Sequence, residues 1–544
     1  MRYFAGLVTA ALLLLALVFP GISCRNPAGS LSRAESMYAE LEDASSIASA
    51  IDSGLFASYR GNDQAAWKQL AELDRPRLVA ELAKISEPGL SADDARALML
   101  MRKSVDAMSR EQEPLAPKGR CGDAQGSGLK ASDLHAALYA CFDELGNNLQ
   151  FEGQRVTRVA AFDLLTQMKE PQGRKDLFMA FVPLWRAING NNEAASPYRR
   201  MLALSVAEYA KTGSPIDDAA KTLDVQPAQI ETWLVSILEA WSKVNGGQQI
   251  EPWDYHYSGG EADRLLSSSV PTDSMLPITQ RYYDDLGADL KKLGILYDLA
   301  PRPGKAPLAY TEYVVRGHAV NGSWQPTVAY VSGNYARGGL GLLNELVHEN
   351  GHAVHMMALH TRPAFMDLGD AVFYEAFADV PSWDTYEPAW QQKYLGKSAP
   401  ESVSLRSLFS GVMLDVAWAL FEIRMLKDPA ADPNGVWTQI TSRYLHVVPH
   451  PELSWWAVRV QLVESPGYMV NYGLGSVITA DIRQHVRDSI GSFASGNPKW
   501  YPWISDHLLR QGMERETSVE LKEFLGRPVS PDALLSQIAR IGVR

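Results

Sequence analysis

Cysteine is scarce in this chain, and the two cysteines beyond the N-terminal segment, Cys121 and Cys141, stand far apart. Two thiols at this separation do not form a metal-binding motif, so a cysteine-ligated metal site is not expected. A disulfide between them would tether the glycine-rich loop at 122–128 to the helix that follows. Two unpaired buried cysteines are the alternative.

The sequence also lacks the patterns of nucleotide-binding and nucleic-acid-binding proteins. It contains no GxGxxG or phosphate-loop motif. Lys and Arg number 51 against 63 Asp and Glu, for a formal net charge of −12. A nucleic-acid partner is not expected, because binding to the phosphate backbone requires a basic surface. Repeats, low-complexity tracts and Pro/Ser-rich linkers are absent too, which favours one continuous structural unit.

Long apolar runs are missing except at the N-terminus, where residues 4–19 follow Arg2. This run is too short for a membrane-spanning helix and is typical of a secretory signal, which we place at residues 1–24. Cys24 ends the segment as in a lipoprotein processing site, although Gly21 stands where such sites usually carry Leu. We expect an exported protein, either periplasmic or anchored through a lipidated Cys24 and facing the periplasm or cell exterior. No later stretch is expected to span a membrane.

Residues 348–352 read His-Glu-Asn-Gly-His, in which two histidines are one helical turn apart and a glutamate follows the first. Apolar residues on both sides predict a buried helix, where unsatisfied polar groups are costly. A divalent cation would satisfy His348 and His352 and create a Lewis acid. We therefore expect one Zn²⁺ ion bound to these histidines.

A catalytic zinc usually has three protein ligands and an open position. Glu375, in the apolar helical segment 373–379, is the expected third ligand. Asp379 is one turn further on the same face, where its carboxylate would accept the outer N–H of a ligating histidine. An ordinary pair of helix-surface carboxylates is the alternative. Glu345 and His355, on the first helix, are expected to pack or to support the site.

Glu349 is the expected general base, because its side chain is turned about 100° from the histidines around the helix axis. Zinc lowers the pKa of bound water and polarises a peptide carbonyl, so a neighbouring base completes a hydrolytic site. The same carboxyl group would pass the proton to the departing amine. These residues predict peptide-bond hydrolysis.

These motifs resemble those of the thimet oligopeptidase and dipeptidyl carboxypeptidase family of zinc metallopeptidases. The resemblance covers roughly residues 305–490 and begins with the apolar stretch 325–335, which ends in Gly-Asn-Tyr and precedes the His-Glu-x-Gly-His helix. Glu375-Ala376 with Asp379 is closer to the related angiotensin-converting-enzyme pattern. The resemblance implies a large, mainly α-helical body with a small β-sheet near the active site and a deep substrate channel between two lobes.

Residues 466–472 resemble the oligopeptidase segment Gly-Gly-Tyr-x-x-x-Tyr. By this resemblance, Tyr468 and Tyr472 are catalytic candidates whose hydroxyls would bind the transition-state oxyanion; core packing is the alternative. Two positions depart from the family pattern. Val463 stands where the family has a histidine, and Gly475 stands where it has a further tyrosine.

The apolar run 327–332 predicts a strand that ends at Gly333. If this is an edge strand, an extended peptide could pair with its main chain, whatever the peptide sequence. The substrate-binding residues expected here are Ala329, Tyr330, Val331, Ser332 and Gly333.

Helical patterning dominates the rest of the chain, at residues 34–58, 93–110, 132–145, 197–211, 227–244, 405–426 and 468–487. We divide the chain into the signal at 1–24, an N-terminal helical region at 25–300 and a catalytic helical region with the zinc site at 301–544, the last two forming one structural unit.

The function that the sequence predicts is that of an exported, monomeric zinc peptidase acting on short oligopeptides, as an oligopeptidase or a dipeptidyl carboxypeptidase. The alternatives are a catalytically inactive peptide-binding lipoprotein with the same fold and a structural zinc site with a fourth protein ligand.

Overall fold

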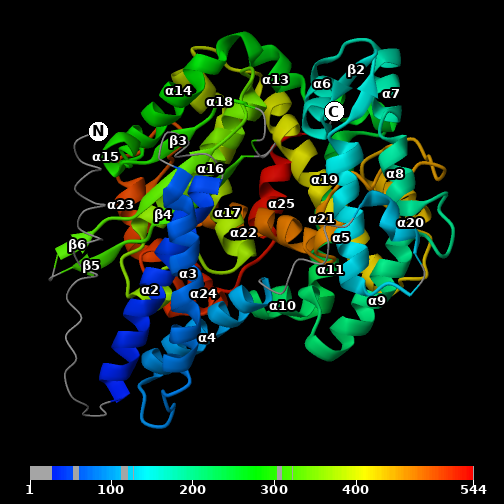
Figure 1. Cartoon of the computed structure of the whole chain (residues 1–544). Coiled ribbons are helices and arrows are strands. Elements are labelled where there is room, and N and C mark those ends of the chain that lie inside the picture. The colour runs from blue at the N-terminus through cyan, green and yellow to red at the C-terminus, as the bar shows by residue number, and fades with distance from the viewer. Residues whose placement is uncertain are drawn as a thin grey trace.

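The molecule is mainly α-helical, as the computed structural model shows for residues 27–52, 61–111, 120–126, 128–302, 305, 309–320 and 323–542 (Figure 1). The predicted fold class is thereby confirmed. The helices predicted beyond residue 92 form within a few residues of their expected bounds, whereas the first begins earlier, at Pro27. The predicted signal, with Cys24, lies outside the described residues.

The helices before the sheet are α2 (Pro27–Asp52), α3 (Gly61–Leu82), α4 (Ala92–Glu111), α5 (Ala131–Cys141), α6 (Arg158–Gln167), α7 (Pro171–Met179), α8 (Val182–Asn189), α9 (Pro197–Thr212), α10 (Pro215–Thr222), α11 (Pro227–Asn245), α12 (Tyr255–Gly259), α13 (Glu261–Leu266), α14 (Thr272–Asp285) and α15 (Leu290–Leu293). The helices after it are α16 (Leu340–Ala358), α17 (Ala371–Ser382), α18 (Pro388–Leu395), α19 (Glu401–Lys427), α20 (Pro433–Tyr444), α21 (Gln461–Glu464), α22 (Met469–Ile490), α23 (Trp500–Ile504), α24 (Thr517–Leu525) and α25 (Asp532–Ala539).

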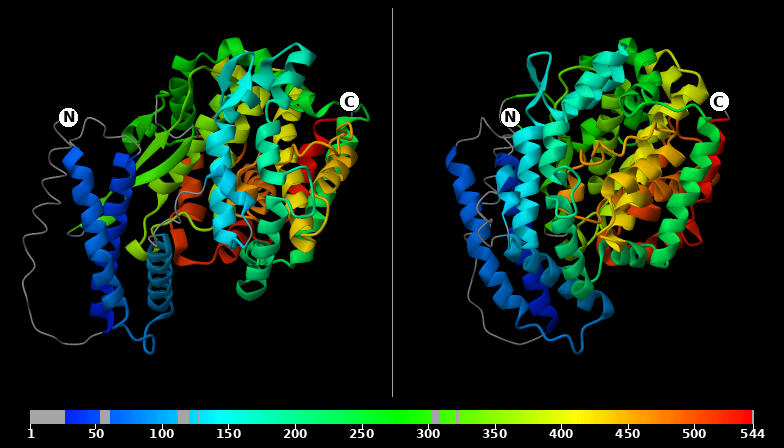
Figure 2. Two further views of the ribbon diagram at one scale, coloured as in Figure 1. Left: turned by 45° about the vertical axis from the view of Figure 1, so that its right-hand side comes forward. Right: turned by 90° about the vertical axis from the view of Figure 1, so that its right-hand side faces the viewer.

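The N-terminal helices α2, α3 and α4 lie on one side of the molecule, shown in blue in Figures 1 and 2, and α2 packs along strand β4 (Tyr310–Val315). Arg362, in the loop after α16, fixes two of these helices. Its guanidinium donates to both carboxylate oxygens of Glu35 on α2, at 2.8 and 2.9 Å, and to Asp94 on α4 at 2.8 Å. This side of the molecule is therefore attached to the segment that follows the histidine helix.

The sheet beside α16 has three strands in the order β3 (Leu296–Asp298), β7 (Val328–Ser332) and β4. The expectation that residues 327–332 form an edge strand is wrong, because β7 pairs in parallel with β3 and antiparallel with β4. Ala329, Tyr330, Val331 and Ser332 are buried in this central strand, and Gly333 donates its N–H to Asp298. None of these five residues lines the cavity described below.

Two short antiparallel pairs complete the described strands: β1 (Leu149–Phe151) with β2 (Gln154–Val156), and β5 (His318–Val320) with β6 (Ser323–Gln325). The structure joins Cys121 and Cys141 in a disulfide, which links the short helical turn Cys121–Gln125 to the end of α5.

One large hydrophobic core runs through most of the molecule, with members from Ala124 to Ile541. Helix α19 lies in this core against α11 and α22. By length and composition it is apolar enough to cross a membrane, with a mean hydropathy of 1.4, which differs from the sequence expectation. Because 56% of that apolar window is buried within the protein, its composition is that of a core helix.

Candidate metal centre

Helix α16 carries the His-Glu-x-x-His motif in its middle, where Glu349, Asn350, Gly351 and His352 are buried. The helix is also buried through Leu343, Leu346 and Val347. Two hydroxyls from neighbouring elements hold the middle of the helix: Tyr283 donates to the carbonyl of Val347 at 2.7 Å, and Tyr297 of β3 donates to Asn350 at 2.6 Å. Helix α14 and the sheet therefore fix the rotation of α16, and with it the direction in which the side chains of the motif point.

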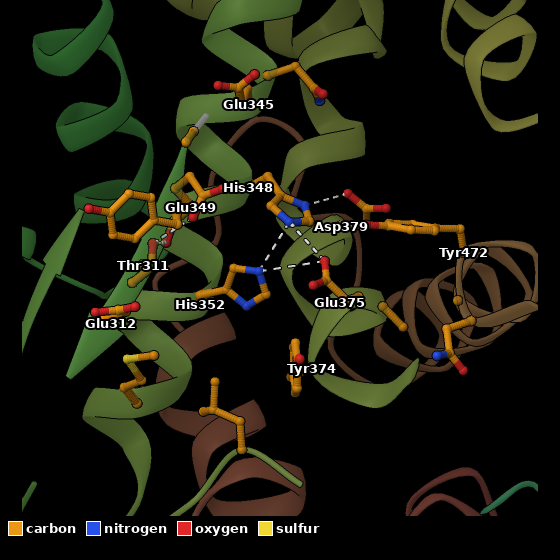
Figure 3. A pocket seen from close by; sticks show the side chains of 18 of the residues that line it. Thr311, Glu312, Glu345, His348, Glu349, His352, Tyr374, Glu375, Asp379 and Tyr472 are labelled. Carbon is orange, nitrogen blue, oxygen red and sulfur yellow. Dashed lines mark hydrogen bonds and ion pairs between the residues drawn. The ribbon is translucent and has the colours of Figure 1, made fainter. Parts of the chain in front are cut away.

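Helix α17 crosses α16 and brings Glu375 to the two histidines (Figure 3). The Nε2 atoms of His348 and His352 are 3.1 Å apart, and Glu375 Oε2 lies 3.4 Å from the first and 3.8 Å from the second. Ligands at zinc-like distances of about 2.0–2.2 Å in a tetrahedron are separated by about 3.3–3.6 Å. The three groups therefore surround a space of the size that a single metal ion requires.

Asp379 determines which nitrogen of His348 faces this space. Its carboxylate Oδ1 lies 2.7 Å from His348 Nδ1 and also accepts from Ser382 at 3.0 Å. Because a carboxylate can only accept, Nδ1 carries a hydrogen, and a ring that has lost its other proton directs the Nε2 lone pair at His352 and Glu375. Converging lone pairs and a carboxylate repel one another unless a cation lies between them, so these donors fit a divalent metal.

Without a cation, the charges of this cluster are strongly coupled. Burial lowers the pKa of His348, but the carboxylates of Asp379 and Glu375 outweigh it and raise that pKa well above 6.5. Burial and the neighbouring His348 lower the pKa of His352 to about 3. The carboxylates thus stabilise one positive charge at this position, which a metal ion would supply in place of the proton.

Glu349 lies beside the cluster on the side of β4 and is held by Thr311 (Figure 3). The Thr311 hydroxyl donates to Glu349 Oε2 at 2.7 Å and lies 2.9 Å from the Glu349 carbonyl. Burial, with smaller contributions from Glu345 and Glu375, raises the pKa of Glu349 to about 7. A carboxyl group in this state both accepts and returns a proton near neutral pH.

The two predicted tyrosines have different positions. Tyr472 lines the cavity. Tyr468, just before α22, does not line the cavity; its ring packs against the ring of Tyr472, with 5.7 Å between the centroids. A third tyrosine, Tyr374, was missed by the sequence analysis. It lies 5.7 Å from the His352 ring, lines the cavity, and shares a hydrogen bond with Tyr468. The sequence did contain a signal for this residue, because Tyr374 directly precedes the predicted ligand Glu375.

Val463 and Gly475, the two positions that depart from the family pattern, differ in whether they line the cavity. Val463 is buried and its carbonyl accepts a hydrogen bond from His135, so this position supplies nothing to the cavity. Gly475 lines the cavity, and a Cβ there would meet only the carbonyl of Val372, at 3.9 Å. His355 packs against the rings of Phe373 and Phe377, and Glu345 lines the cavity.

The cluster opens into a cavity of about 1070 Å³ between two walls. One wall is formed by Ser45, Ser46 and Ser49 of α2 together with residues 309–313, in and just before β4. The other wall comes from α6, α19, α22 and the loop before α21, with Arg158, Asp415, Arg459 and Tyr472. Thr311 and, in the second wall, Arg158, Asp415 and Arg459 were also missed, because their separation in the sequence gave no sign that these residues meet α16.

No family model and no curated protein matches the sequence. Three solved structures share its fold over nearly the whole length. Pz peptidase A with an inhibitor has a TM-score of 0.58 and 15% sequence identity, and the match covers 97% of this chain and 98% of the other. The M32 carboxypeptidase of Deinococcus radiodurans R1 has a TM-score of 0.54 and 15% identity, over 94% of this chain and 99% of the other. Trypanosoma cruzi metallocarboxypeptidase 1 has a TM-score of 0.55 and 14% identity, over 94% of this chain and 99% of the other. The chain therefore shares the fold of these peptidases, which agrees with the broader part of the resemblance, whereas the specific likeness to the thimet oligopeptidase and angiotensin-converting-enzyme families is not supported by them.

Proposed function

We propose that this chain is an exported, zinc-dependent peptidase that hydrolyses short peptides. The observation that carries this proposal is the meeting of His348, His352 and Glu375, whose ligand atoms all lie within 4.8 Å of one another, beside a buried glutamate in a large cavity. Its fold is shared with proteins named as a peptidase and as metallocarboxypeptidases. Among the described residues, no further His, Cys, Asp or Glu joins the three, which favours an open position over a structural zinc.

His348, His352 and Glu375 would hold the ion, and Asp379 would keep the His348 tautomer fixed. When bound, zinc polarises the scissile carbonyl and lowers the pKa of water. Thr311 occupies Oε2 of Glu349, so Oε1 is the atom that takes the proton of the attacking water and returns it to the departing amine. Tyr472 and Tyr374, which line the same cavity, are the hydroxyls available to the oxyanion.

A peptide would lie extended along β4. Among the described strands, β4 pairs only with β7, and its residues 310–313 line the cavity. Main-chain pairing with this strand would bind peptides of many sequences. A cavity of about 1070 Å³ between β4 and α22 would admit flexible oligopeptides and exclude folded proteins.

Export is supported by the pattern of residues 1–24 and by the disulfide between Cys121 and Cys141, which forms stably in oxidising compartments. We propose a periplasmic or membrane-anchored location, with acylation of Cys24 as the anchor. Mass spectrometry of the purified N-terminal peptide tests this. If the mature chain begins after Cys24, or if Cys24 carries no lipid, the protein has no lipid anchor at this residue and would be exported in free form.

Cleavage of internally quenched peptides by the full exported chain tests the activity. We expect turnover that a chelator abolishes and added Zn²⁺ restores. Glu349→Gln should lower kcat by about 10²–10⁴-fold while metal content is unchanged. The matched control is Glu345→Gln, one turn earlier on α16, which removes a half-buried carboxyl that lines the same cavity and is not hydrogen-bonded to Thr311.

A metal-loaded wild-type protein that binds these peptides without cleaving any of them would instead establish the alternative, a peptide-binding lipoprotein. Equal loss of activity in Glu345→Gln and Glu349→Gln would remove the assignment of Glu349 as the base.

A further inference from the structure

We infer that Gly475 of α22 forms the floor of a subsite that takes a bulky apolar side chain of the peptide substrate, on a residue that flanks the cleaved bond. This inference rests on the proposed function and names a residue that selects among substrates. Gly475 lies in the second turn of α22 and lines the cavity.

Neither the backbone nor the packing of α22 requires a glycine at position 475. Gly475 does not have a positive φ. A Cβ there would meet a single atom within 4 Å, the carbonyl oxygen of Val372 at 3.9 Å, which is ordinary van der Waals contact. Gly473 on the same helix differs, since its Cβ would come within 2.8 Å of the Ala419 Cβ. Because glycine destabilises a helix relative to alanine, packing explains Gly473 and leaves Gly475 unexplained.

The space in front of Gly475 belongs to the cavity. The residue is buried, and a buried side chain normally contacts roughly six to twelve other residues. Here one atom lies within 4 Å of the Cβ position, and the residue lines the cavity of about 1070 Å³. The missing side chain therefore leaves room that the side chain of a ligand can enter.

This room lies next to the metal centre. The Thr479 hydroxyl is 2.8 Å from the carbonyl oxygen of Gly475 and 2.9 Å from that of Ala376 on α17, so these two cavity residues are close neighbours. Ala376 directly follows Glu375, whose Oε2 lies 3.4 Å from His348 Nε2. A peptide whose scissile carbonyl lies at the histidine cluster would therefore place a flanking residue over Gly475.

The lining of this room favours an apolar occupant. Ala376 contributes a methyl group, and Tyr472 and Asn471, one turn before Gly475, contribute an aromatic ring and an amide. The nearest carboxylate in the sequence, that of Glu375, faces the two histidines (Figure 3). A leucine or phenylalanine side chain would bury apolar surface here, whereas a charged one would find no counter-ion.

Kinetics with quenched peptides that differ at one residue test this inference. Alanine, leucine and phenylalanine are placed in turn at each of the two residues that flank the cleaved bond. At one of them, we expect the metal-loaded wild type to cleave the phenylalanine peptide with a kcat/KM at least about tenfold higher than that for the alanine peptide. Gly475→Leu should lower kcat/KM for this phenylalanine peptide about 10–100-fold and change that for the alanine peptide less than about twofold.

Gly475→Ala distinguishes a role in selection from a role in stability. Its single methyl group should lower kcat/KM for the phenylalanine peptide less than Gly475→Leu does. The midpoint of urea unfolding should not fall, because alanine favours the helix and its Cβ meets no clash. A purely structural role for Gly475 would lower the midpoint instead, and that result would contradict the inference.

Gly411→Leu is the matched control, because Gly411 is an exposed glycine of α19 that has nothing within 4 Å of its Cβ position and does not line the cavity. It should keep the preference for phenylalanine. Equal losses on the alanine and phenylalanine peptides in Gly475→Leu, at unchanged metal content, would overturn the inference. A wild type that ignores side-chain size at both flanking residues would overturn it too.

If the wild type cleaves none of these peptides, the proposed hydrolysis fails, and calorimetric binding of the same peptides to the metal-loaded protein decides the inference separately. Tighter binding of a phenylalanine peptide that is lost in Gly475→Leu would support it. Equal affinities for the alanine and phenylalanine peptides in the wild type would overturn it.

Discussion

Gly351 on α16 touches the backbone of Ala378 on α17. A Cβ at Gly351 would lie 2.7 Å from the Ala378 Cα and 2.8 Å from its carbonyl oxygen, closer than any side chain tolerates. The glycine inside the His-Glu-x-Gly-His motif therefore has a structural reason: it allows the helix with Glu375 to approach the helix with the histidines.

Gly351→Ala should separate these helices and weaken metal binding. We expect a loss of about 1–3 kcal/mol in the free energy of unfolding, because overpacking a rigid contact between backbones strains both helices. Zinc affinity should fall as well, since Glu375 moves away with α17. Urea unfolding and chelator competition measure the two effects.

The control for this substitution is Gly411→Ala in α19, where an added Cβ meets nothing within 4 Å. The free energy of unfolding of this variant should rise by up to about 1 kcal/mol, because alanine has a higher helix propensity than glycine. If both substitutions change stability alike, the contact with Ala378 does not limit the approach of the helices.

Asp379→Ala should lower zinc affinity about 10–100-fold, because His348 loses the acceptor that fixes its tautomer and orientation. Competition with a chromophoric chelator measures this. Ser382→Ala is the control, since it removes only the hydroxyl that donates to the same Asp379 oxygen at 3.0 Å and keeps the carboxylate. Unchanged affinity in Asp379→Ala would mean that His348 is oriented by packing alone.

Thr311→Val should reduce kcat about tenfold without changing metal content, because the hydroxyl that holds Glu349 Oε2 is lost at nearly constant volume. Thr311→Ser should restore most of the activity, since it keeps the donor. Steady-state kinetics and elemental analysis of the three proteins measure these effects. Loss of activity in Thr311→Ser equal to that in Thr311→Val would show that the hydroxyl alone does not account for the role of Thr311.

Stability should fall as the pH rises from about 5 to about 8, in part because of Glu422 on α19. This carboxyl group is fully buried, accepts the N–H of Met469 at 2.8 Å, and burial raises its pKa to about 8 from 4.5. The folded protein retains a proton there that the unfolded chain releases near 4.5. The stabilisation is therefore complete below pH 4.5 and is lost as the pH passes through 8.

Glu422→Gln should flatten this dependence, because the amide is neutral throughout and keeps an oxygen for Met469. Urea unfolding of both proteins at pH 5 and pH 8.5 gives the comparison. An identical pH slope in the variant and the wild type would show that this carboxyl group does not carry the effect.

The parts of the site that the sequence predicted are those with local signals. Spacing along one helix places His348, Glu349 and His352, and one further helical turn relates Glu375 to Asp379. Helix periodicity is local too, which explains why the helices beyond residue 92 formed near their predicted bounds.

The errors concern contacts between distant segments. The pattern of residues 328–332 is that of a buried strand, but only the addition of β3, about thirty residues earlier, makes it central instead of an edge. Thr311 and Arg158 reach the cavity through the sheet order and the packing of α6, which no local pattern encodes. Such pairings follow from the whole fold and are invisible in a window of residues.

The continuous core from Ala124 to Ile541 has a practical consequence for anyone who wishes to transplant this chemistry. A fragment limited to residues 301–544 would keep the three donors yet expose the apolar faces that α5, α9 and α11 now cover, and it would aggregate before it could bind an ion. Grafting the centre onto another scaffold would therefore require α16 and α17 together with the Gly351 contact between them, instead of a cut at the domain boundary that the motifs suggest.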